Sequence, residues 1–272
     1  MDSFNLLNSL TVVVPVGLSN MNVHNLNTWA NQLDLYPVIK EVIVVLDKQV
    51  ENNFNSNRIR QEIYNSKKIK WIEGNYNSPG LARNVGKNFV NSKFVVFWDS
   101  DDIPNLNNLE EVMIVSSKNQ FDLAVTKYTR TNKLSGKEKE MGNSTREILM
   151  NPGIWRVIFK MEFIRNLEFG ISKMGEDQVF LARCLAKNPK IIRVNLNLYN
   201  YIIGNQFQLT KNWDAISTLN VSRRDVGKIL KKNSRWYFAI FLIYTRLFLT
   251  EKKFLLKACL RNTNVEMSKN EK

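Results

Sequence analysis

Short runs of β-branched and aromatic residues recur along the first half of the chain and predict buried strands. The runs are LTVVVPV at 10–16, EVIVVLD at 41–47, KIKWIE at 68–73 and KFVVFW at 93–98. Two segments between them, 25–35 and 81–90, carry apolar residues at helical spacing. Because strands alternate with helices, we expect a parallel sheet that is covered by helices on both faces.

The second half of the chain continues this pattern less regularly. We expect a helix at 107–117, a strand at 121–128 and a polar loop at 129–143. An amphipathic stretch at 155–164, a second helix from about Glu176 and a last strand at 191–203 follow. The composition changes beyond about residue 216 without a linker rich in Pro, Gly or Ser. The C-terminal part is therefore expected to pack on the part that precedes it.

Polar residues follow three of the predicted strands at the point where each strand ends. Asp47 ends the second run, Gly74 and Asn75 follow the third, and three carboxylates follow the fourth. In open α/β sheets, ligands bind beyond the carboxyl ends of the strands. These three polar stretches are therefore expected to meet at one edge of the sheet.

The fourth strand leads directly into an acidic turn, residues 99–102, within the stretch FVVFWDSDDIP. Three carboxylates within four residues repel one another unless a cation or hydrogen-bond donors neutralise them. Mg²⁺ and Mn²⁺ bind carboxylate oxygens together with substrate phosphates and waters, so the acidic turn is a candidate site for one of these ions. The alternative is a turn followed by a helix N-cap, for which Asp and Ser are favoured.

The 272 residues carry a formal net charge of +14, which favours an acidic partner such as nucleic acid, an anionic membrane or a phosphate-bearing substrate. Nucleic acid is not expected, because the sequence has no zinc-finger spacing, RNA-recognition signature or basic residues interleaved with aromatic ones. Cys184 and Cys259 lie outside any disulfide or metal-binding pattern, and the first residues lack the features of a secretion signal. We therefore expect a cytoplasmic protein.

Five stretches resemble, in order and spacing, the family 2 glycosyltransferases with the GT-A fold. They are Pro15 after the first strand, EVIVVLD, GLARNVG at 80–86, FWDSDD at 97–102 and GED at 175–177. The resemblance covers residues 10 to about 205 and implies a mixed, mainly parallel α/β sheet flanked by helices. It implies a GT-A catalytic domain at 1–215, divided into nucleotide-sugar binding at about 1–105 and an acceptor side at about 106–215. A basic, helical C-terminal extension, residues 216–272, follows.

The resemblance also implies roles on the donor side of the site. Asp47 binds the nucleotide base, Arg83 reaches the nucleotide or its phosphates, and Asp101 and Asp102 bind the ribose and a divalent metal. The alternatives are a turn-forming role for Asp47 and a surface position on a helix for Arg83. The implied donor-binding set is Pro15, Val16, Asp47, Arg83, Asp99, Ser100 and Asp101, and the implied ligands of Mn²⁺ or Mg²⁺ are Asp102 and Asp101.

On the acceptor side, the resemblance implies that Asp177 is the general base and that Glu176 beside it holds the acceptor or a backbone group. A single base without a nucleophilic carboxylate implies inversion of the anomeric centre. The alternative for both residues is an acidic first turn of a helix. Trp155 and Lys211 complete the acceptor set. Trp155 has the alternative of a core position, and Lys211 replaces an arginine that the family often has after Tyr201.

The C-terminal extension contains WYFAIFLIYTRLFL at 236–249, which is shorter than the ~20 apolar residues of a membrane-spanning helix. Lysines and arginines are frequent on both sides of this run. We therefore expect residues 228–261 to lie on an anionic membrane surface, with the protein on the inner face of the plasma membrane. The alternative is a pair of helices whose apolar sides pack on the catalytic domain.

Together these features predict a metal-dependent, inverting glycosyltransferase. It would transfer a sugar from a nucleotide-diphosphate donor, preferably a UDP-sugar, to a saccharide or lipid-linked saccharide acceptor. The product would be a capsule-type surface polysaccharide or a lipopolysaccharide. Two alternatives stay open: a nucleotidyltransferase, which would need a glycine-rich phosphate loop near the first strand, and a catalytically inactive saccharide-binding protein of the same fold.

Overall fold

The structure is a computed structural model and describes residues 6–17, 23–47, 66–144, 147–148, 151–204, 213–231 and 234–270. Side chains are described for these residues except 23, 24, 213 and 257–270. Lys211, one of the residues expected on the acceptor side, lies outside the described residues.

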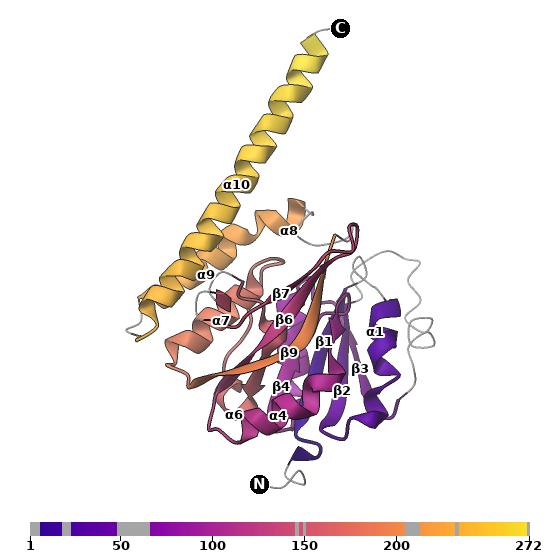
Figure 1. The fold of residues 1–272 in the computed structure, drawn as a ribbon. Helices are drawn as coiled ribbons and strands as arrows, with labels where there is room; N and C mark the ends of the chain where they lie inside the picture. The colour runs from indigo at the N-terminus through magenta and orange to yellow at the C-terminus, as the bar shows by residue number, and fades with distance from the viewer. Residues whose placement is uncertain are drawn as a thin grey trace.

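The first half of the chain forms four parallel strands, as the apolar runs predict. β1 (Leu10–Gly17) lies between β2 (Ile39–Asp47) and β4 (Phe94–Phe97), and β3 (Ile69–Gly74) pairs with the other side of β2 (Figure 1). The register sets Gly17 beside Asp47 and Asp47 beside Gly74. The ends of these three strands therefore share one edge of the sheet.

The second half adds strands that make the sheet mixed. β8 (Val157–Lys160) runs antiparallel to both β4 and β6 (Leu123–Asn132), and β9 (Ile191–Ile203) runs parallel to β6. β5 (Ile103–Pro104) follows the acidic turn and pairs antiparallel with β9. The strand order β3-β2-β1-β4-β8-β6-β9-β5 confirms the mixed, mainly parallel sheet of an α/β protein.

One expectation for this half is wrong, and another changes in detail. Residues 129–143 are not a loop, because β6 continues to Asn132 and forms a hairpin with β7 (Glu138–Met141). Most side chains at the end of this hairpin are polar and exposed, so it lacks the apolar alternation that marks a half-buried strand. The stretch 155–164 is divided among a 3-10 helix (Ile154–Arg156), β8 and α6 (Met161–Ile164).

The helices that flank the sheet lie where the apolar spacing predicts them. They are α1 (Val23–Ala30), α3 (Pro79–Asn88), α4 (Leu109–Ser117) and α7 (Glu176–Ala186). The helix expected at 25–35 ends earlier, because a separate 3-10 helix (Leu33–Leu35) follows α1. A second 3-10 helix (Leu106–Asn108) leads into α4.

Both faces of the sheet are buried, and β1 shows how the sequence achieves this. Val12 and Val14 pack in one core together with residues of α1 and α4, whereas Val13 packs in a second core with residues of α3 and α7. All three valines are fully buried. Successive side chains of a strand point to opposite faces, so a continuous apolar run supplies both cores at once.

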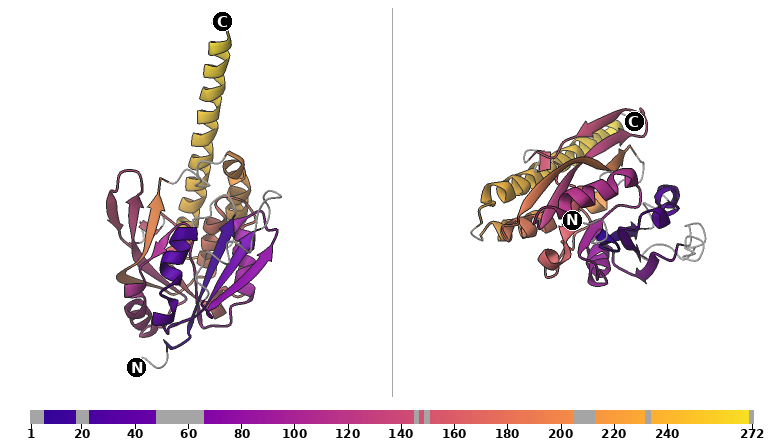
Figure 2. Two further views of the ribbon diagram at one scale, coloured as in Figure 1. Left: turned by 90° about the vertical axis from the view of Figure 1, so that its right-hand side faces the viewer. Right: turned by 60° about the horizontal axis from the view of Figure 1, so that its bottom comes forward.

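The C-terminal extension packs on the second core. Packing on the catalytic domain was the alternative to a position on a membrane surface. The helices of the extension are α9 (Leu219–Leu230) and α10 (Tyr237–Asn270), and α8 (Trp213–Ser217) crosses the expected boundary at 215. Buried Val226 and Ile243 belong to the same hydrophobic cluster as residues of α7. The last turns of α10 extend beyond the other elements (Figures 1 and 2). Among the helices described, none has the length and apolar character needed to cross a membrane.

Helix α3 approaches the sheet closely at Gly86, where a Cβ would lie 2.5 Å from Val13 Cγ1 and 2.9 Å from Val45 Cγ2. We predict that Gly86→Ala lowers the free energy of unfolding by about 1–3 kcal/mol, because overpacking forces these valines to shift. Denaturant unfolding measures the change. Gly17→Ala is the matched control, since no atom of the described residues lies within 4 Å of its added Cβ. Equal losses in the two variants would contradict the packing explanation.

Candidate active site

Strand β9 holds the acidic turn at the edge of the sheet. The Asp99 N–H donates to the Tyr199 hydroxyl at 2.9 Å, and the Ile202 N–H donates to Asp102 Oδ1 at 2.7 Å. Tyr199 and Asp102 are both almost completely buried. The two ends of the turn are therefore fixed by neighbouring residues of one strand.

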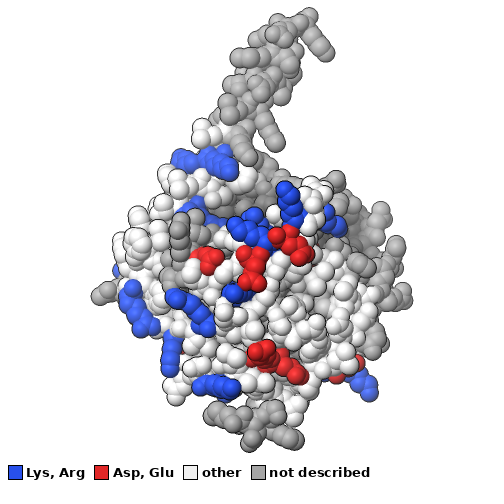
Figure 3. Space-filling model, in the orientation of Figure 1, with Lys and Arg blue, Asp and Glu red and all other residues white. Residues whose placement is uncertain are grey.

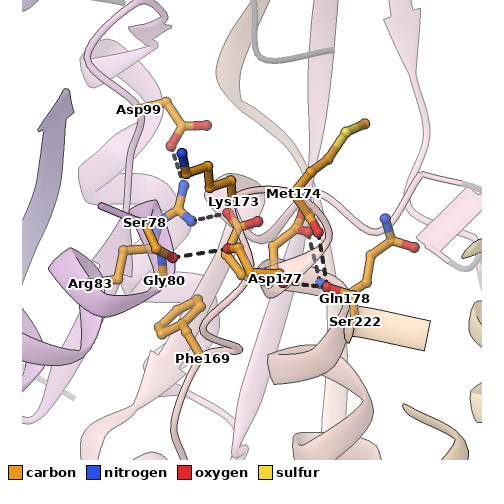
Figure 4. Close-up of polar contacts among 12 residues, drawn as sticks. Ser78, Gly80, Arg83, Asp99, Phe169, Lys173, Met174, Asp177, Gln178 and Ser222 are labelled. Atoms are coloured by element: carbon orange, nitrogen blue, oxygen red, sulfur yellow. Dashed lines mark hydrogen bonds and ion pairs between the residues drawn. The ribbon is translucent and has the colours of Figure 1, made fainter. Parts of the chain in front are cut away.

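Arg83 of α3 joins the acidic turn to the beginning of α7. Its side chain is buried, with Nη2 at 2.6 Å from Asp99 Oδ1 and Nη1 at 2.6 Å from Glu176 Oε1 (Figure 4). The guanidinium carbon lies 5.6 Å from the centre of the Phe169 ring. Hydrogen bonds between ionised groups are stronger than those between neutral groups. One side chain therefore ties α3 and the acidic turn to α7, whose Glu176 lies 93 positions along the chain from Arg83.

Two further residues of α3 fix the segment that leads to α7. Asn84 Oδ1 accepts the Phe169 N–H at 2.7 Å, and its Nδ2 donates to the Phe169 carbonyl at 3.3 Å. Lys87 Nζ donates to the carbonyls of Arg165 and Leu167 at 2.8 and 2.7 Å. The backbone around 165–169 thus follows the face of α3.

The first turn of α3 lies directly against this segment. Ser78 caps the helix by accepting the Gly80 N–H at 3.2 Å, and its hydroxyl donates to the Ser172 carbonyl at 2.9 Å. A Cβ on Gly80 would overlap the Gly170 carbonyl oxygen and lie 3.0 Å from Glu176 Cβ. The helix can therefore approach Glu176 only with glycine at this position.

Glu176 and Asp177 form the first turn of α7, after Gly175 in the left-handed conformation, φ 83°. Burial and the charge of Asp177 raise the pKa of Glu176 to about 7, against the opposing effect of Arg83. Burial also raises the pKa of Asp177, which Arg83 and the Gln178 N–H partly offset. A carboxylate with a raised pKa is a more effective general base, so this turn can accept a proton from a substrate.

Asp101 and Asp102 form a second pair of carboxylates. Burial and the charge of Asp99 raise the pKa of Asp101 to about 7, and burial with the charges of Asp101 and Asp99 raises the pKa of Asp102 well above its ordinary value. Asp102 Oδ2 is buried and has no hydrogen-bond partner among the described residues. Two desolvated carboxylates with an unsatisfied oxygen fit a divalent cation.

These carboxylates would supply only part of a coordination shell. In the described ranges, no three or more His, Cys, Asp or Glu side chains are grouped so that they could hold a metal ion. Mg²⁺ and related ions commonly take one or two protein carboxylates and complete their shell with waters and substrate phosphates. The acidic turn therefore fits a cation that arrives with, or is completed by, a phosphate-bearing ligand.

On the face in Figure 3, the Lys and Arg side chains of the described residues do not form one continuous patch. Several of them lie next to acidic side chains near the middle of this face. A continuous basic stripe is the usual feature of a nucleic-acid surface. The distribution on this face thus suits a local, mixed-charge site.

Asp47 has the turn-forming role that was the alternative to binding a nucleotide base. Its Oδ1 accepts the Tyr76 N–H at 3.0 Å and its Oδ2 accepts the Asn77 N–H at 2.7 Å. Both oxygens therefore shape the turn that leads from β3 to α3. A contact with a nucleotide base stays a prediction.

Trp155 occupies the core position that was the alternative to an acceptor platform. It is 8 % exposed, and its ring stacks on Tyr199 and Tyr201 with centroids 4.8 and 5.2 Å away. The Tyr128 ring packs edge-on at 4.5 Å. Its ring is covered in this way, so Trp155 has the core position, and a contact with the acceptor stays a prediction.

Arg83 and Glu176 are both buried and bonded to each other. Their expected contacts with the nucleotide and the acceptor stay predictions. Of the remaining donor candidates, Val16 and Ser100 are buried and Pro15 is half-buried, which leaves mainly backbone atoms for contact there. The donor contacts of these three residues stay predictions.

Three residues that organise the site carried no assigned role in the sequence analysis. Asn84 lies within GLARNVG, and a polar residue on the inner side of a short helix could have indicated a buried hydrogen bond. Tyr199 alternates with Tyr201 along β9, which indicates one face but not a contact with Asp99. Asn25, whose Nδ2 donates to the Asp101 carbonyl at 2.6 Å, has no distinguishing pattern around it.

Comparisons with known proteins agree on one family and fold. Residues 25–174 match Glycosyl transferase family 2. Glycosyltransferase GlyA of Streptococcus pneumoniae is 25% identical over 257 residues, which cover 84% of this chain and 36% of that protein. The chain thus spans about a third of the length of this curated relative.

Solved structures of S. aureus TarS share the fold. The TarS 1–349 structure superposes with a TM-score of 0.62 at 18% identity, covering 90% of this chain and 72% of that one. The same TarS fragment in complex with UDP-GlcNAc gives a TM-score of 0.66 at 18% identity, over 90% and 73% of the two chains. At this identity the likeness concerns the fold alone.

We predict that Arg83→Met lowers the free energy of unfolding by about 3–5 kcal/mol, because it leaves buried carboxylates without their cation. Adding Glu176→Gln to Arg83→Met should recover part of the loss. Chemical denaturation measures both effects. The control is Arg223→Met, which removes the less buried ion pair with Glu251 and should cost below about 1 kcal/mol. If the double variant is no more stable than Arg83→Met, the pairing of Arg83 with Glu176 is not what stabilises the site.

Proposed function

The chain belongs to glycosyl transferase family 2, and from this we propose that it transfers a sugar from a nucleotide-diphosphate donor to an acceptor hydroxyl. One observation carries the proposal: Arg83 brings the acidic turn and the first turn of α7 to a single site. The acidic turn belongs to the donor side, at about 1–105. The first turn of α7 belongs to the acceptor side, at about 106–215.

On the donor side, Asp101 and Asp102 would hold Mn²⁺ or Mg²⁺, with Asp101 also near the ribose. Their raised pKa values and the unsatisfied Asp102 Oδ2 support this assignment. When bound, the cation offsets the negative charge that develops on the leaving diphosphate. Asp47 would contact the nucleotide base from the end of β2, and Asp99 would support the acidic turn through Arg83.

On the acceptor side, Asp177 would act as the general base. The acceptor oxygen forms a bond to the anomeric carbon while the bond from that carbon to the diphosphate breaks. The bonding electrons leave with the nucleoside diphosphate, and the acceptor proton moves to the Asp177 carboxylate. One displacement inverts the anomeric centre. Arg83 and Glu176 keep Asp177 in place through the buried ion pair.

A UDP-sugar is the proposed donor, which is supported by the fold that the chain shares with the UDP-GlcNAc complex of TarS. The proposed acceptor is a saccharide or a lipid-linked saccharide of a surface polysaccharide or lipopolysaccharide. The raised pKa of Asp177 supports a hydroxyl acceptor, because a hydroxyl must lose its proton during the attack.

A thermal-shift panel of nucleotide-diphosphate sugars, with and without Mn²⁺, tests the donor and metal assignments. We expect UDP-sugars to raise the melting temperature only with Mn²⁺, because the acidic turn needs the cation to accept a diphosphate. Asp102→Ala should abolish this shift. Asp177→Asn should keep the shift but lower turnover of the bound donor by about 10²–10⁴-fold.

Asp225→Asn, a half-buried residue of α9 that pairs with exposed Lys228, is the control and should change neither readout. If no nucleotide sugar shifts the melting temperature, the donor assignment fails. Full turnover by Asp177→Asn would remove Asp177 as the base. A metal-dependent shift without any turnover by the unchanged protein would favour the inactive saccharide-binding protein.

The proposed contact with an anionic membrane uses the outer face of α10. Phe238, Phe241 and Phe248 recur at helical spacing and are 68%, 43% and 38% exposed, whereas Ile240 and Ile243 on the opposite side are fully buried. Exposed lysines lie farther along the same helix. An apolar face next to basic residues suits the headgroup region of an anionic leaflet. This contact would place the protein at the inner face of the plasma membrane.

We predict that Phe238→Ser with Phe241→Ser weakens binding to anionic vesicles by roughly tenfold or more, since each phenylalanine loses its apolar contact with lipid. Co-sedimentation with phosphatidylglycerol vesicles measures this, with phosphatidylcholine vesicles as the lipid control. Leu35→Ser changes an equally exposed apolar residue far from α10 in the sequence and should have no effect. Unchanged binding of the double variant would exclude α10 as the membrane face. If the unchanged protein instead forms a dimer and does not bind vesicles, and the double variant is monomeric, the face serves self-association.

A further inference from the structure

The C-terminal extension lies directly on the turn that carries the proposed base. A Cβ on Gly175, the residue before Glu176, would lie 3.0 Å from Leu247 Cδ2 of α10 and 3.0 Å from Ser222 Oγ of α9. Leu247 and Ser222 are 1% and 0% exposed. Helices α9 and α10 therefore form the wall behind the first turn of α7.

Hydroxyl groups of the extension also fix the backbone that leads into this turn. Thr218 Oγ1 accepts the N–H groups of Lys173 and Met174 at 3.1 and 3.2 Å. The Ser222 hydroxyl donates to the Met174 carbonyl at 2.9 Å and contacts the Ser172 hydroxyl (Figure 4). The segment before Asp177 is thus held from one side by α3 and from the other side by α9.

Arg246 stands next to Leu247 on α10 and interacts electrostatically with Asp177. Burial lowers the pKa of Arg246, whereas Asp177, Tyr128 and Tyr201 raise it. In turn, burial raises the pKa of Asp177, and Arg83, the Gln178 N–H and Arg246 lower it. Two of the helices around this turn therefore contribute one arginine each, Arg83 from α3 and Arg246 from α10.

The charges that face Asp177 explain why a second cation matters. The acidic groups are Asp99 after β4, Glu176 on α7 and the Tyr201 phenol of β9, and the basic groups are Arg83 and Arg246. Arg83 is hydrogen-bonded to Asp99 and Glu176 and also interacts with Asp177, so its charge is shared among three carboxylates. The second guanidinium, that of Arg246, lowers the pKa of Asp177 and so favours the ionised form of its carboxylate.

We propose that Arg246 of α10 is a positioning residue of the active site, which orients Asp177 and keeps its carboxylate ionised to accept the acceptor proton. This inference rests on the proposed function of Asp177. It makes the C-terminal extension part of the catalytic apparatus, because Arg246, Leu247, Thr218 and Ser222 all belong to residues 216–272.

The pH profile of donor turnover tests the role of Arg246. With Arg246→Gln, we expect the acidic limb of the kcat profile to move up by about 0.5–1 pH unit, so that turnover at a pH on that limb falls roughly three- to tenfold, with the KM for the donor unchanged. Arg246→Lys should restore much of the profile, since it returns the positive charge. Arg223→Gln is the matched control, because Arg223 pairs with Glu251 between α9 and α10 away from the base.

A second measurement does not depend on activity. The pKa of Asp177 can be followed by NMR in protein labelled with ¹³C at the aspartate carboxyl groups, with Asp177→Asn identifying its signal. Arg246→Gln should raise that pKa by a similar amount, whereas Arg223→Gln should leave it in place. An unchanged pKa of Asp177 overturns the inference whether or not the protein turns over a nucleotide sugar.

The remaining outcomes separate this inference from the proposed function. A raised pKa of Asp177 in Arg246→Gln, with no turnover by the unchanged protein, supports the inference and contradicts the proposed transfer reaction. An unchanged pH profile with a raised KM for the acceptor overturns the inference and assigns Arg246 to acceptor binding. Equal loss of melting temperature and activity in Arg246→Gln, Arg246→Lys and Arg223→Gln overturns it in favour of a purely structural role.

Discussion

The buried guanidinium of Arg83, bonded to Asp99 on one side and to Glu176 on the other, is the interaction on which the site depends. Moving each of these ions out of water costs several kcal/mol, and only good geometry offsets that cost. The geometry exists only when α3, the acidic turn and α7 are all in place. Asn84 and Lys87, on the same helix, add the hydrogen bonds that hold the neighbouring segment at the right distance. The site is therefore completed only with the fold, because Glu176 lies 93 positions along the chain from Arg83.

The site concentrates negative charge in a chain whose net charge is +14. Five carboxylates lie in the acidic turn and the first turn of α7, and burial raises the pKa of four of them. The Ile202 N–H of β9 and the arginines offset part of the repulsion, but Asp102 Oδ2 stays unsatisfied among the described residues. Such a site gains stability from a cationic ligand, and the cation proposed for the acidic turn uses this property.

The sequence predicts the parallel half of the sheet well, because β1, β2 and β4 are mostly apolar runs that are buried on both faces. β3, at the edge of the sheet, is only partly buried and carries Lys70 and Glu73 among its apolar residues. The sequence does not predict the hairpin of β6 and β7. Its exposed polar residues adopt strand conformation because they pair with neighbouring strands, and not because they are buried. The sequence also places Asp47 and the acidic turn at the ends of strands, as the structure has them. It could not show that Arg83 and Glu176 bond to each other, or that Trp155 is covered by tyrosines, because such contacts depend on the distance between segments. Residue type and spacing identify a site, while the division of its members into substrate contacts and supports needs the packing.

The change of composition near residue 216 suggests a separate basic module, yet the packing links it to the catalytic part. Buried residues of α9 and α10 share one hydrophobic core with α3 and α7, so removing the extension would open that core to water. The apolar run of 236–249 serves two sides of one helix, with Ile240 and Ile243 facing the core and Phe238 and Phe241 facing outward. On the proposed function, the same rigid helix carries Arg246 at the base and the membrane face on its outer side. The distance from the base to the membrane surface would then be set by α10 itself, which is the arrangement that a lipid-linked acceptor requires.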